Sequence, residues 1–407
     1  MLRVPAQANS EMKEDSAKWL RWVPVPIFVL AGIGLRFAGL DFRSVDIYDF
    51  LLGWYDKLAV GGFEALREPF SNYTPPYLYL LFLITKTAGF IPKIAAIKLL
   101  SICFDFLNAF LVYKILKVRY PQSATALTSA ALFLLLPTVL LNSAYWGQSD
   151  AIYTCFLLTC IYFLIKDQPI VAMIFLGISF AFKAQAAFLG PFILLLMIKK
   201  RIPWYSLGIV PVVYLLMMVP AVLAGRPMIE LVTIYVNQTG FYRSLSEHAP
   251  NLYLFIPNTL YNPVVTIGLG MTALIAVVWA AIYARKIKEF TPQMLLLCAL
   301  VSAAMLPFFL PKMHDRYFYL AEVLSFLVAF YLSRWWLPAL GYQIVSGLVY
   351  AVVLTANAVP VDPALAGSIL ILAAFVNTAL MGYLFWKQWQ LTNSDVESYT
   401  FHLTPDT

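Results

Sequence analysis

The chain has 407 residues, of which 61% are hydrophobic and only 12% are charged, and its formal net charge is +7. So few charges exclude a soluble protein of this size, and apolar runs long enough to cross a bilayer recur along the whole sequence. The alternating short strands of a membrane β-barrel do not occur in it. We therefore predict an all-α polytopic membrane protein.

The apolar segments predict about twelve transmembrane helices. Residues 1–21 are polar and of mixed charge, and no cleavage site follows a short apolar core. We interpret them as a cytosolic tail before a retained first helix, not as a removed signal peptide. The predicted helices cover residues 22–40, 94–117, 123–142, 150–165, 169–182, 184–198, 205–224, 263–284, 292–311, 318–333, 336–355 and 360–386.

Basic residues lie in short clusters between these apolar segments. Because short cytosolic loops carry an excess of Lys and Arg, the clusters predict a cytosolic position for their loops and for both termini. We therefore assign the positive charge to membrane orientation and not to nucleic-acid binding. The clusters are Lys114, Lys117 and Arg119; Lys199, Lys200 and Arg201; and Arg285, Lys286 and Lys288.

One apolar segment, "PPYLYLLFLITKTAGFIPK" at 75–93, does not fit this orientation as a crossing. It has only about fifteen apolar residues, fewer than a spanning helix needs. We interpret it as an amphipathic helix in the outer interface, with its tyrosines as anchors. Residues 41–93 then form one long outer loop.

With this orientation, four polar patches share the outer face: 41–76, 144–150, 225–262 and 312–319. Polar and ionisable groups at membrane depth are costly and usually functional, so the sequence predicts a site on this face. The chain is thus divided into five parts. A tail at 1–21 precedes a catalytic transmembrane module at 22–224, which includes outer loop 41–93. An outer loop at 225–262, C-terminal transmembrane helices at 263–386 with the outer motif 312–319, and a cytosolic tail at 387–407 follow.

The first loop carries two candidate catalytic carboxylates, Asp46 and Asp49. They lie three residues apart, so they share a face of a helix, and Trp54 follows them. A carboxylate here is suited to act as a general base that takes a proton from an acceptor hydroxyl. The alternative is an ordinary polar loop whose acids cap helices or pair with Arg43.

The stretch "NSAYWGQSD" places Trp146, Gln148 and Asp150 at a junction between two helices. An indole beside an amide and a carboxylate is suited to bind a sugar hydroxyl or a lipid headgroup. Trp54 is assigned to the same sugar or acceptor pocket. The alternative is an interfacial tryptophan next to an aspartate that caps a helix.

Cations form the third group of candidates. Lys183 lies between two short apolar runs, and "KMHDRYFY" supplies Lys312, His314 and Arg316 within five positions. Close spacing brings such donors onto one phosphate, for which Arg offers a planar fork and Lys a point charge, and Asp315 orients the His or the Arg. The alternatives are a snorkelling lysine and a basic loop that pairs with lipid headgroups.

Arg36 and Asp105 lie within predicted helices, where we expect them to pair and brace the bundle. The sequence has no glycine-rich phosphate loop, no nucleotide signature and no zinc spacing, and its four cysteines lie in apolar segments as packing residues. We therefore predict no metal site and no required cofactor. The acid-rich first loop leaves a divalent cation open as an alternative.

Taken in order, these residues resemble the GT-C superfamily of integral-membrane glycosyltransferases, especially bacterial relatives of the GPI mannosyltransferases. A more distant similarity is to the glucosyltransferases that complete the asparagine-linked oligosaccharide. Between residues 36 and 319, the resemblance is carried by the first-loop aspartate, "NYTPPYLYL", Asp105, "YWGQSD", "FKAQ" and "HDRYFY".

This resemblance implies a polyprenyl-phosphate-linked sugar as donor, inversion at the anomeric carbon, and an active site on the periplasmic or lumenal side. It implies that the base is the first-loop aspartate, Asp46 first and Asp49 in reserve, and that Lys183, His314 and Arg316 lie around the donor phosphate. In the glucosyltransferase branch a lysine stands where this chain has Arg316. The short chain points to a bacterial inner-membrane protein.

We therefore expect a hexosyltransferase that moves mannose or another hexose to a glycolipid or glycan acceptor on the outer face of the membrane. Two other classes remain open. One is a flippase or transporter of lipid-linked saccharides, although no internal repeat is evident between the two halves. The other is an outer-face polysaccharide polymerase or ligase.

Overall fold

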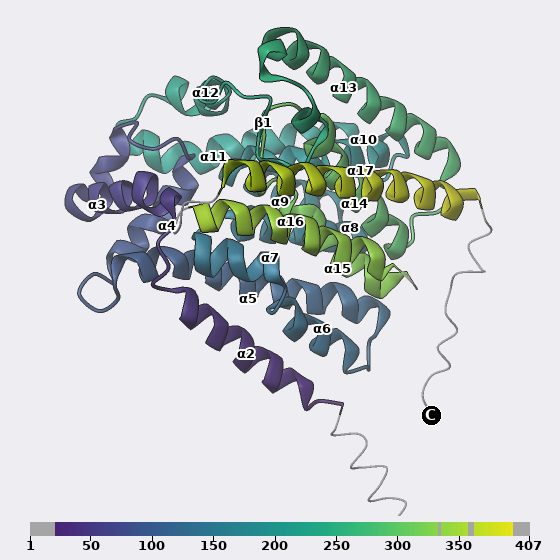
Figure 1. Ribbon diagram of the computed structural model, residues 1–407, viewed down its shortest axis with the longest axis horizontal. Coiled ribbons are helices and arrows are strands. Elements are labelled where there is room, and N and C mark those ends of the chain that lie inside the picture. The colour runs from purple at the N-terminus through teal and green to yellow at the C-terminus, as the bar shows by residue number, and fades with distance from the viewer. Residues whose placement is uncertain (1–20, 333–334, 357–361, 394–407) are drawn as a thin grey trace, which may run out of the picture.

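The computed structural model describes residues 21–332, 335–356 and 362–393. The predicted tails lie largely outside these residues, at 1–20 and 394–407. The described chain is almost wholly helical, and its helices pack into one bundle (Figure 1). This confirms the predicted all-α class.

Segments of 3₁₀- or π-helix are labelled η. The first half of the chain forms α2 (Pro24–Gly39), η1 (Ile47–Leu51), α3 (Leu52–Gly61), η2 (Gly62–Arg67), α4 (Pro75–Thr85), α5 (Lys93–Arg119), α6 (Thr125–Phe133), α7 (Pro137–Leu140), η3 (Leu141–Trp146), α8 (Asp150–Ile165), α9 (Pro169–Phe182), η4 (Ala184–Leu189) and α10 (Gly190–Ile198). The second half forms η5 (Trp204–Gly208), α11 (Ile209–Leu223), α12 (Met228–Gln238), β1 (Ser246–Glu247), η6 (Leu252–Phe255), η7 (Asn258–Leu260), α13 (Tyr261–Lys286), α14 (Pro292–Phe309), β2 (Met313–His314), α15 (Tyr319–Tyr331), α16 (Trp336–Ala356) and α17 (Pro363–Asn393).

Among the described residues, six helices are long and apolar enough to cross a membrane, and a bent pair raises this number to seven. The bent pair joins α6 to the α7–η3 segment at an angle of 47°. The bend has a local cause, because Pro137 keeps Leu136 out of the helical conformation. The remaining predicted spans are shorter apolar helices, so twelve crossings stay a prediction.

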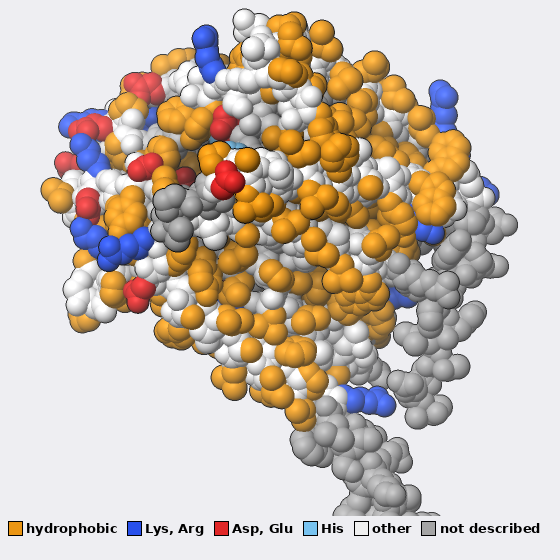
Figure 2. All heavy atoms as spheres, in the orientation of Figure 1, with side chains coloured by type: hydrophobic (Ala, Val, Ile, Leu, Met, Phe, Trp, Pro, Cys, Tyr) orange, Lys and Arg blue, Asp and Glu red, His pale blue; other side chains and the backbone are white. Residues whose placement is uncertain are grey.

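The helices differ in how deeply they are buried. Most side chains of α14 and nearly all of those of α15 are buried, whereas α13 exposes apolar side chains along much of its length. Figure 2 shows apolar side chains over most of one face, with acidic and basic side chains gathered together at the end where α3 lies. An apolar belt of this kind is expected of a protein embedded in a bilayer.

The first loop contains two short helices, α3 and α4, and α4 differs from its predicted form. It ends at Thr85, not at residue 93, and turns follow it. Tyr77 is 2% exposed and packs against Trp54 and Tyr73, so it belongs to the protein core. The hydroxyl of Tyr79 forms two hydrogen bonds with the backbone of α11. The prediction that these tyrosines anchor the helix in the membrane interface is therefore wrong.

The predicted basic clusters gather at one end of the bundle. Lys199 donates to the carbonyl of Ile287 (2.9 Å), which joins the clusters at 199–201 and 285–288. Arg201 pairs with Asp167, just beyond the C-terminus of α8 (2.9 Å). Lys286 donates to Asn393 (2.6 Å), where α17 ends seven residues beyond the predicted boundary at 386.

The third cluster lies at the corresponding end of α15, where Arg119 stacks over the ring of Tyr331. Helix α8 has 16 residues and spans about 24 Å, so its first residue, Asp150, lies far from this basic end. The two ends of the bundle are thus different in charge as well as in position.

Candidate functional site

A cavity of about 120 Å³ lies where the predicted polar patches meet, beside the start of α8. All four patches contribute to its wall, together with the junction between α9 and η4, so segments far apart in the sequence converge on one hollow. The residues that line it are Asp46, Phe50, Leu51, Trp54, Asn72, Tyr73, Thr74, Gln148, Phe182, Lys183, Gln185, Tyr235, Gln238, Phe241, Tyr242, His314, Arg316 and Tyr317.

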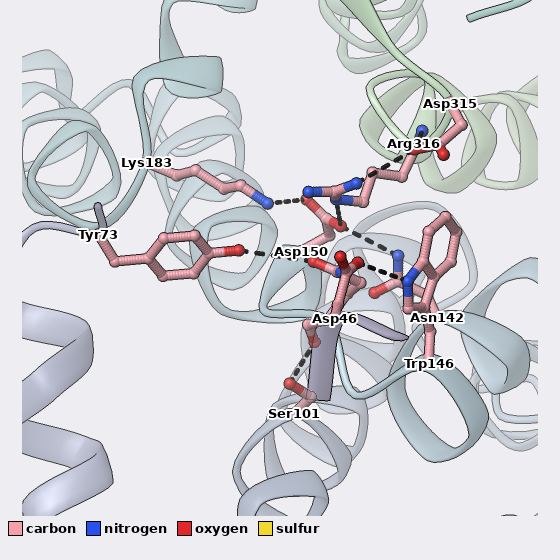
Figure 3. Close-up of polar contacts among 10 residues, drawn as sticks. Asp46, Tyr73, Ser101, Asn142, Trp146, Asp150, Lys183, Asp315 and Arg316 are labelled. Carbon is pink, nitrogen blue, oxygen red and sulfur yellow. Dashed lines mark hydrogen bonds and ion pairs between the residues drawn. The ribbon is translucent and has the colours of Figure 1, made fainter. Parts of the chain in front are cut away.

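Asp46 occupies one wall of the cavity, at the start of the π-helical segment η1, and is half-buried. Its Oδ2 atom accepts hydrogen bonds from Nε1 of Trp146 (2.7 Å) and from Nε2 of Gln148 (Figure 3). Asp49 is exposed and lies outside the set of residues that line the cavity. The geometry therefore separates the two candidate carboxylates and favours Asp46.

The turn that carries Trp146 and Gln148 is shaped by Gly147. Its φ of +80° is in the left-handed region, and a Cβ there would lie 3.0 Å from the side chain of Ile47. Ser44 donates to the carbonyl of Trp146 (2.7 Å). A glycine is required here because the turn and the first loop are in direct contact.

Two cations also line the cavity. Lys183 adopts an extended conformation between α9 and η4, and its Nζ lies 2.5 Å from Oδ1 of Asp150. Nε of Arg316 lies 3.7 Å from Oδ2 of Asp150, and Asn142 donates to that same oxygen (3.0 Å). Asp150 thus bridges both cations (Figure 3).

Asp150 itself is completely buried and does not line the cavity. The prediction that Asp150 contacts the sugar or acceptor does not agree with this position, which keeps it from direct contact with a molecule in the cavity. Its role in this geometry is to hold Lys183 and Arg316. Trp146 is also outside the lining, at 2% exposed, and acts through its bond to Asp46.

Asp315 holds Arg316 from a second side. Its Oδ1 accepts from Nη1 of Arg316 (3.1 Å) and from the backbone N–H of Arg316 (2.9 Å). Burial raises the pKa of Asp315 to about 6, although Arg316 opposes the shift. Burial alone would lower the pKa of Arg316, but the carboxylates of Asp315, Asp46 and Asp150 outweigh it and raise that pKa.

His314 lies in β2, which pairs in parallel with β1, opposite Glu247. Its ring packs edge-on against Tyr242 (centroids 4.9 Å apart) and lies near Tyr317. Burial, followed by the charges of Arg316 and Lys183, lowers the pKa of His314 to about 3. His314 is therefore neutral near pH 7 and adds no positive charge to the cavity, contrary to our expectation.

Lys312 points away from the cavity. Its Nζ donates to the hydroxyl of Tyr261 (2.6 Å) and to the carbonyl of Thr239, and its backbone has a φ of 65°. These contacts tie the motif to the start of α13. The structure does not bring Lys312 together with Lys183 and Arg316.

Below the site, Arg36 and Asp105 form an ion pair in the bundle interior. Nε and Nη2 of Arg36 lie 3.1 and 2.8 Å from Oδ2 of Asp105, to which Ser143 also donates (2.5 Å). The third nitrogen of Arg36 donates to the carbonyl of Leu134 (2.7 Å), next to the break between α6 and α7.

Sequence reasoning missed Tyr73, Lys98 and Ser101. Tyr73 lines the cavity, and its hydroxyl lies 3.5 Å from Oε1 of Gln148. Lys98 and Ser101 hold the loops behind Asp46 and do not line the cavity. The signal for these two was their spacing: with Asp105 and Asn108 they form one polar face of a helix that is otherwise apolar.

The arrangement offers one carboxylate, two fixed cations and an aromatic wall around a single hollow. The described residues contain no group of three or more His, Cys, Asp or Glu placed to hold a metal ion. No protein-family model matches the sequence, and no curated protein is significantly similar to it.

Proposed function

We propose that this protein is an inverting glycosyltransferase. It would move one hexose from a polyprenyl-phosphate-linked donor to a glycolipid or glycan acceptor at the outer face of the membrane. The observation that carries the proposal is the placement of Asp46, Lys183 and Arg316 around one cavity, in a protein whose surface is largely apolar. The ordered motifs that resemble the GT-C superfamily add to it.

The two cations are suited to a phosphate that gains negative charge as it leaves. Preorganised donors aimed at developing charge are usually the largest contribution to catalysis. Lys183 supplies a compact charge and Arg316 a planar fork. Because Asp150 and Asp315 already fix both side chains, little rearrangement is needed when a phosphate binds.

Asp46 is suited to act as the base. Both of its hydrogen bonds within the described chain go to Oδ2, which leaves Oδ1 available to an acceptor hydroxyl. In the reaction, Asp46 takes the hydroxyl proton while the acceptor oxygen bonds to the anomeric carbon. The bond from that carbon to the phosphate oxygen breaks on the opposite face, and the electron pair leaves with the polyprenyl phosphate.

Aromatic side chains next to Asp46 provide a surface for the sugar. The rings of Trp54 and Tyr73 lie 5.1 Å apart, and both residues line the cavity. Rings that combine an apolar face with a polar edge suit a sugar, which has both apolar and hydroxyl surfaces. This aromatic wall is suited to bind a hexose, and it does not distinguish mannose from glucose.

The charge distribution supports an outward-facing site. The basic clusters meet near the C-terminus of α8, whereas the cavity lies near its N-terminus, about 24 Å away. Cytosolic loops are the ones enriched in Lys and Arg. This distribution supports our proposal that the cavity faces the periplasm from a bacterial inner membrane.

The test uses the purified protein in lipid nanodiscs with a membrane lipid extract as acceptor. Radiolabelled polyprenyl-phosphate mannose, glucose and arabinose are supplied separately. We expect transfer of one sugar with inverted stereochemistry, and an unchanged rate after chelation of divalent cations. Transfer from none of the donors, together with flipping of lipid-linked saccharide by the protein in vesicles, would replace the enzyme with a transporter.

A further inference from the structure

One face of α5 carries four polar side chains inside the bundle: Lys98, Ser101, Asp105 and Asn108. They are at most 2% exposed, and their spacing of three, four and three residues aligns them along the helix. Burying polar groups at membrane depth costs free energy, so a row of four such side chains is expected to have a functional role. The proposed mechanism uses none of them directly.

Lys98 is the most costly member of this row. It is 0% exposed, and its ammonium donates to the backbone carbonyls of Gly39 (2.7 Å) and Phe42 (2.6 Å). No carboxylate lies within ion-pair distance of it in the described part of the chain. A snorkelling lysine would turn its charge outward to water, whereas this one turns inward to two carbonyls.

Gly39 is the last residue of α2, and Phe42 lies in the short segment that joins this helix to Asp46. One helical turn further along α5, Ser101 donates to the carbonyl of Gln148. Lys98 and Ser101 therefore hold the two chain segments whose side chains meet at Oδ2 of Asp46. The stem of Lys98 also lies against Gly147, within the same turn as Gln148.

We propose that Lys98 is a positioning residue, which sets the distance between Asp46 and the donors that hold it, Trp146 and Gln148. The inference rests on the proposed function, because it assigns Lys98 an effect on the step in which Asp46 takes a proton. It touches neither the cations nor the cavity. Loss of its ammonium should therefore slow the chemical step and leave donor binding unchanged.

A simpler role is a cap for the C-terminus of α2, since Gly39 is the last residue of that helix. The carbonyl of Phe42 lies three residues beyond the helix, and a cap alone does not explain the second bond. The two roles differ in what they predict. A cap affects stability only, whereas a positioning residue also lowers kcat in the fraction of protein that is folded.

The test compares Lys98→Met, which keeps the stem, with Lys98→Arg, which keeps the charge. The control is Lys93→Met on the same helix, because Lys93 is exposed and pairs with Asp56 at the surface. We expect K98M to lower kcat by about 10²-fold, as a misplacement of about 1 Å does, with little change in KM for the donor. K98R should restore part of the rate, and K93M should match the wild type.

A second measurement does not depend on the reaction. In an Asp46→Cys background, K98M should increase the rate at which a water-soluble maleimide labels the introduced thiol, and K93M should not. Unchanged labelling, or a K98M enzyme with normal kcat and lower stability only, would overturn the positioning role. If the wild type transfers no sugar while K98M still increases labelling, the proposed function fails and the positioning role stands.

Discussion

Within the cavity, Asp46 is held by the neutral donors Trp146 and Gln148, whereas Lys183 and Arg316 are held by the buried carboxylate of Asp150. Neutral donors orient the carboxylate without removing its charge. Asp150 instead compensates the positive charges of Lys183 and Arg316. Without this carboxylate, burying the two cations in the absence of a ligand would cost much free energy. In the proposed mechanism, this difference would keep Asp46 reactive as a base and would keep the two cations fixed until a phosphate binds.

The largest expected effect tests the carboxylate side. Asp46→Asn removes the proton acceptor and keeps its shape, so the rate of sugar transfer should fall by about 10²–10⁴-fold. Asp49→Asn is the matched control and should transfer sugar at nearly the wild-type rate, because Asp49 is exposed and outside the cavity. Equal losses in both variants would contradict the distinction between them.

The next effect tests the cation side. Lys183→Met should lower the transfer rate by about 10²–10³-fold, because one donor to the developing phosphate charge is lost. Arg316→Lys keeps the charge but loses the planar fork, so its loss should be smaller. Lys312→Met serves as the control, since Lys312 contacts Tyr261 and not the cavity. A large loss in that control would mean that the phosphate lies elsewhere.

Asp150→Asn tests how the cations are held. Breaking a buried ion pair typically costs about 3–5 kcal/mol, so the free energy of unfolding should fall by about this amount. Denaturation of the purified protein in detergent measures it. The double variant with Lys183→Met should regain part of the loss, because the unpaired ammonium is also removed. Strictly additive losses would show that the two side chains are not coupled.

The smallest effect concerns pH. Because the pKa of Asp315 is raised to about 6, this carboxyl is charged and holds Arg316 above that pH and is neutral below it. Transfer activity should therefore fall as the pH decreases through about 6. Asp315→Asn should be a few-fold slower at pH 7.5 and should lose this part of the pH profile. An identical profile in wild type and variant would exclude Asp315 as its cause.

Much of the fold could be predicted from hydrophobic periodicity. The segment predicted at 150–165 has the bounds of α8, and that at 94–117 differs from α5 by one or two residues at each end. The composition of 75–93 misled the prediction of tyrosine anchors, because a helix that packs on Trp54 and Tyr73 has the same composition as one that lies in the membrane interface. Composition does not distinguish the two environments.

The site could be predicted only as a set of segments. The sequence indicated that the outer polar patches would meet, and Asp46, Lys183 and Arg316 do line one cavity. The sequence could not indicate which carboxylate pairs with which cation. Asp150 and Lys183, for example, are 33 residues apart, and only the fold brings them together. The neutral state of His314 likewise depends on burial by elements distant in sequence.

The short helix α9 has a consequence for the surrounding lipid. Its 14 residues span about 21 Å, less than the hydrocarbon thickness of about 30 Å, whereas the 26 residues of α13 span about 39 Å. α9 ends at Phe182, next to Lys183, and exposes Ile170 and Ile174. In the proposed twelve-crossing arrangement, hydrophobic matching would make the bilayer thinner beside α9 than beside α13, so acyl-chain length would set the depth of the proposed donor's headgroup relative to that lysine.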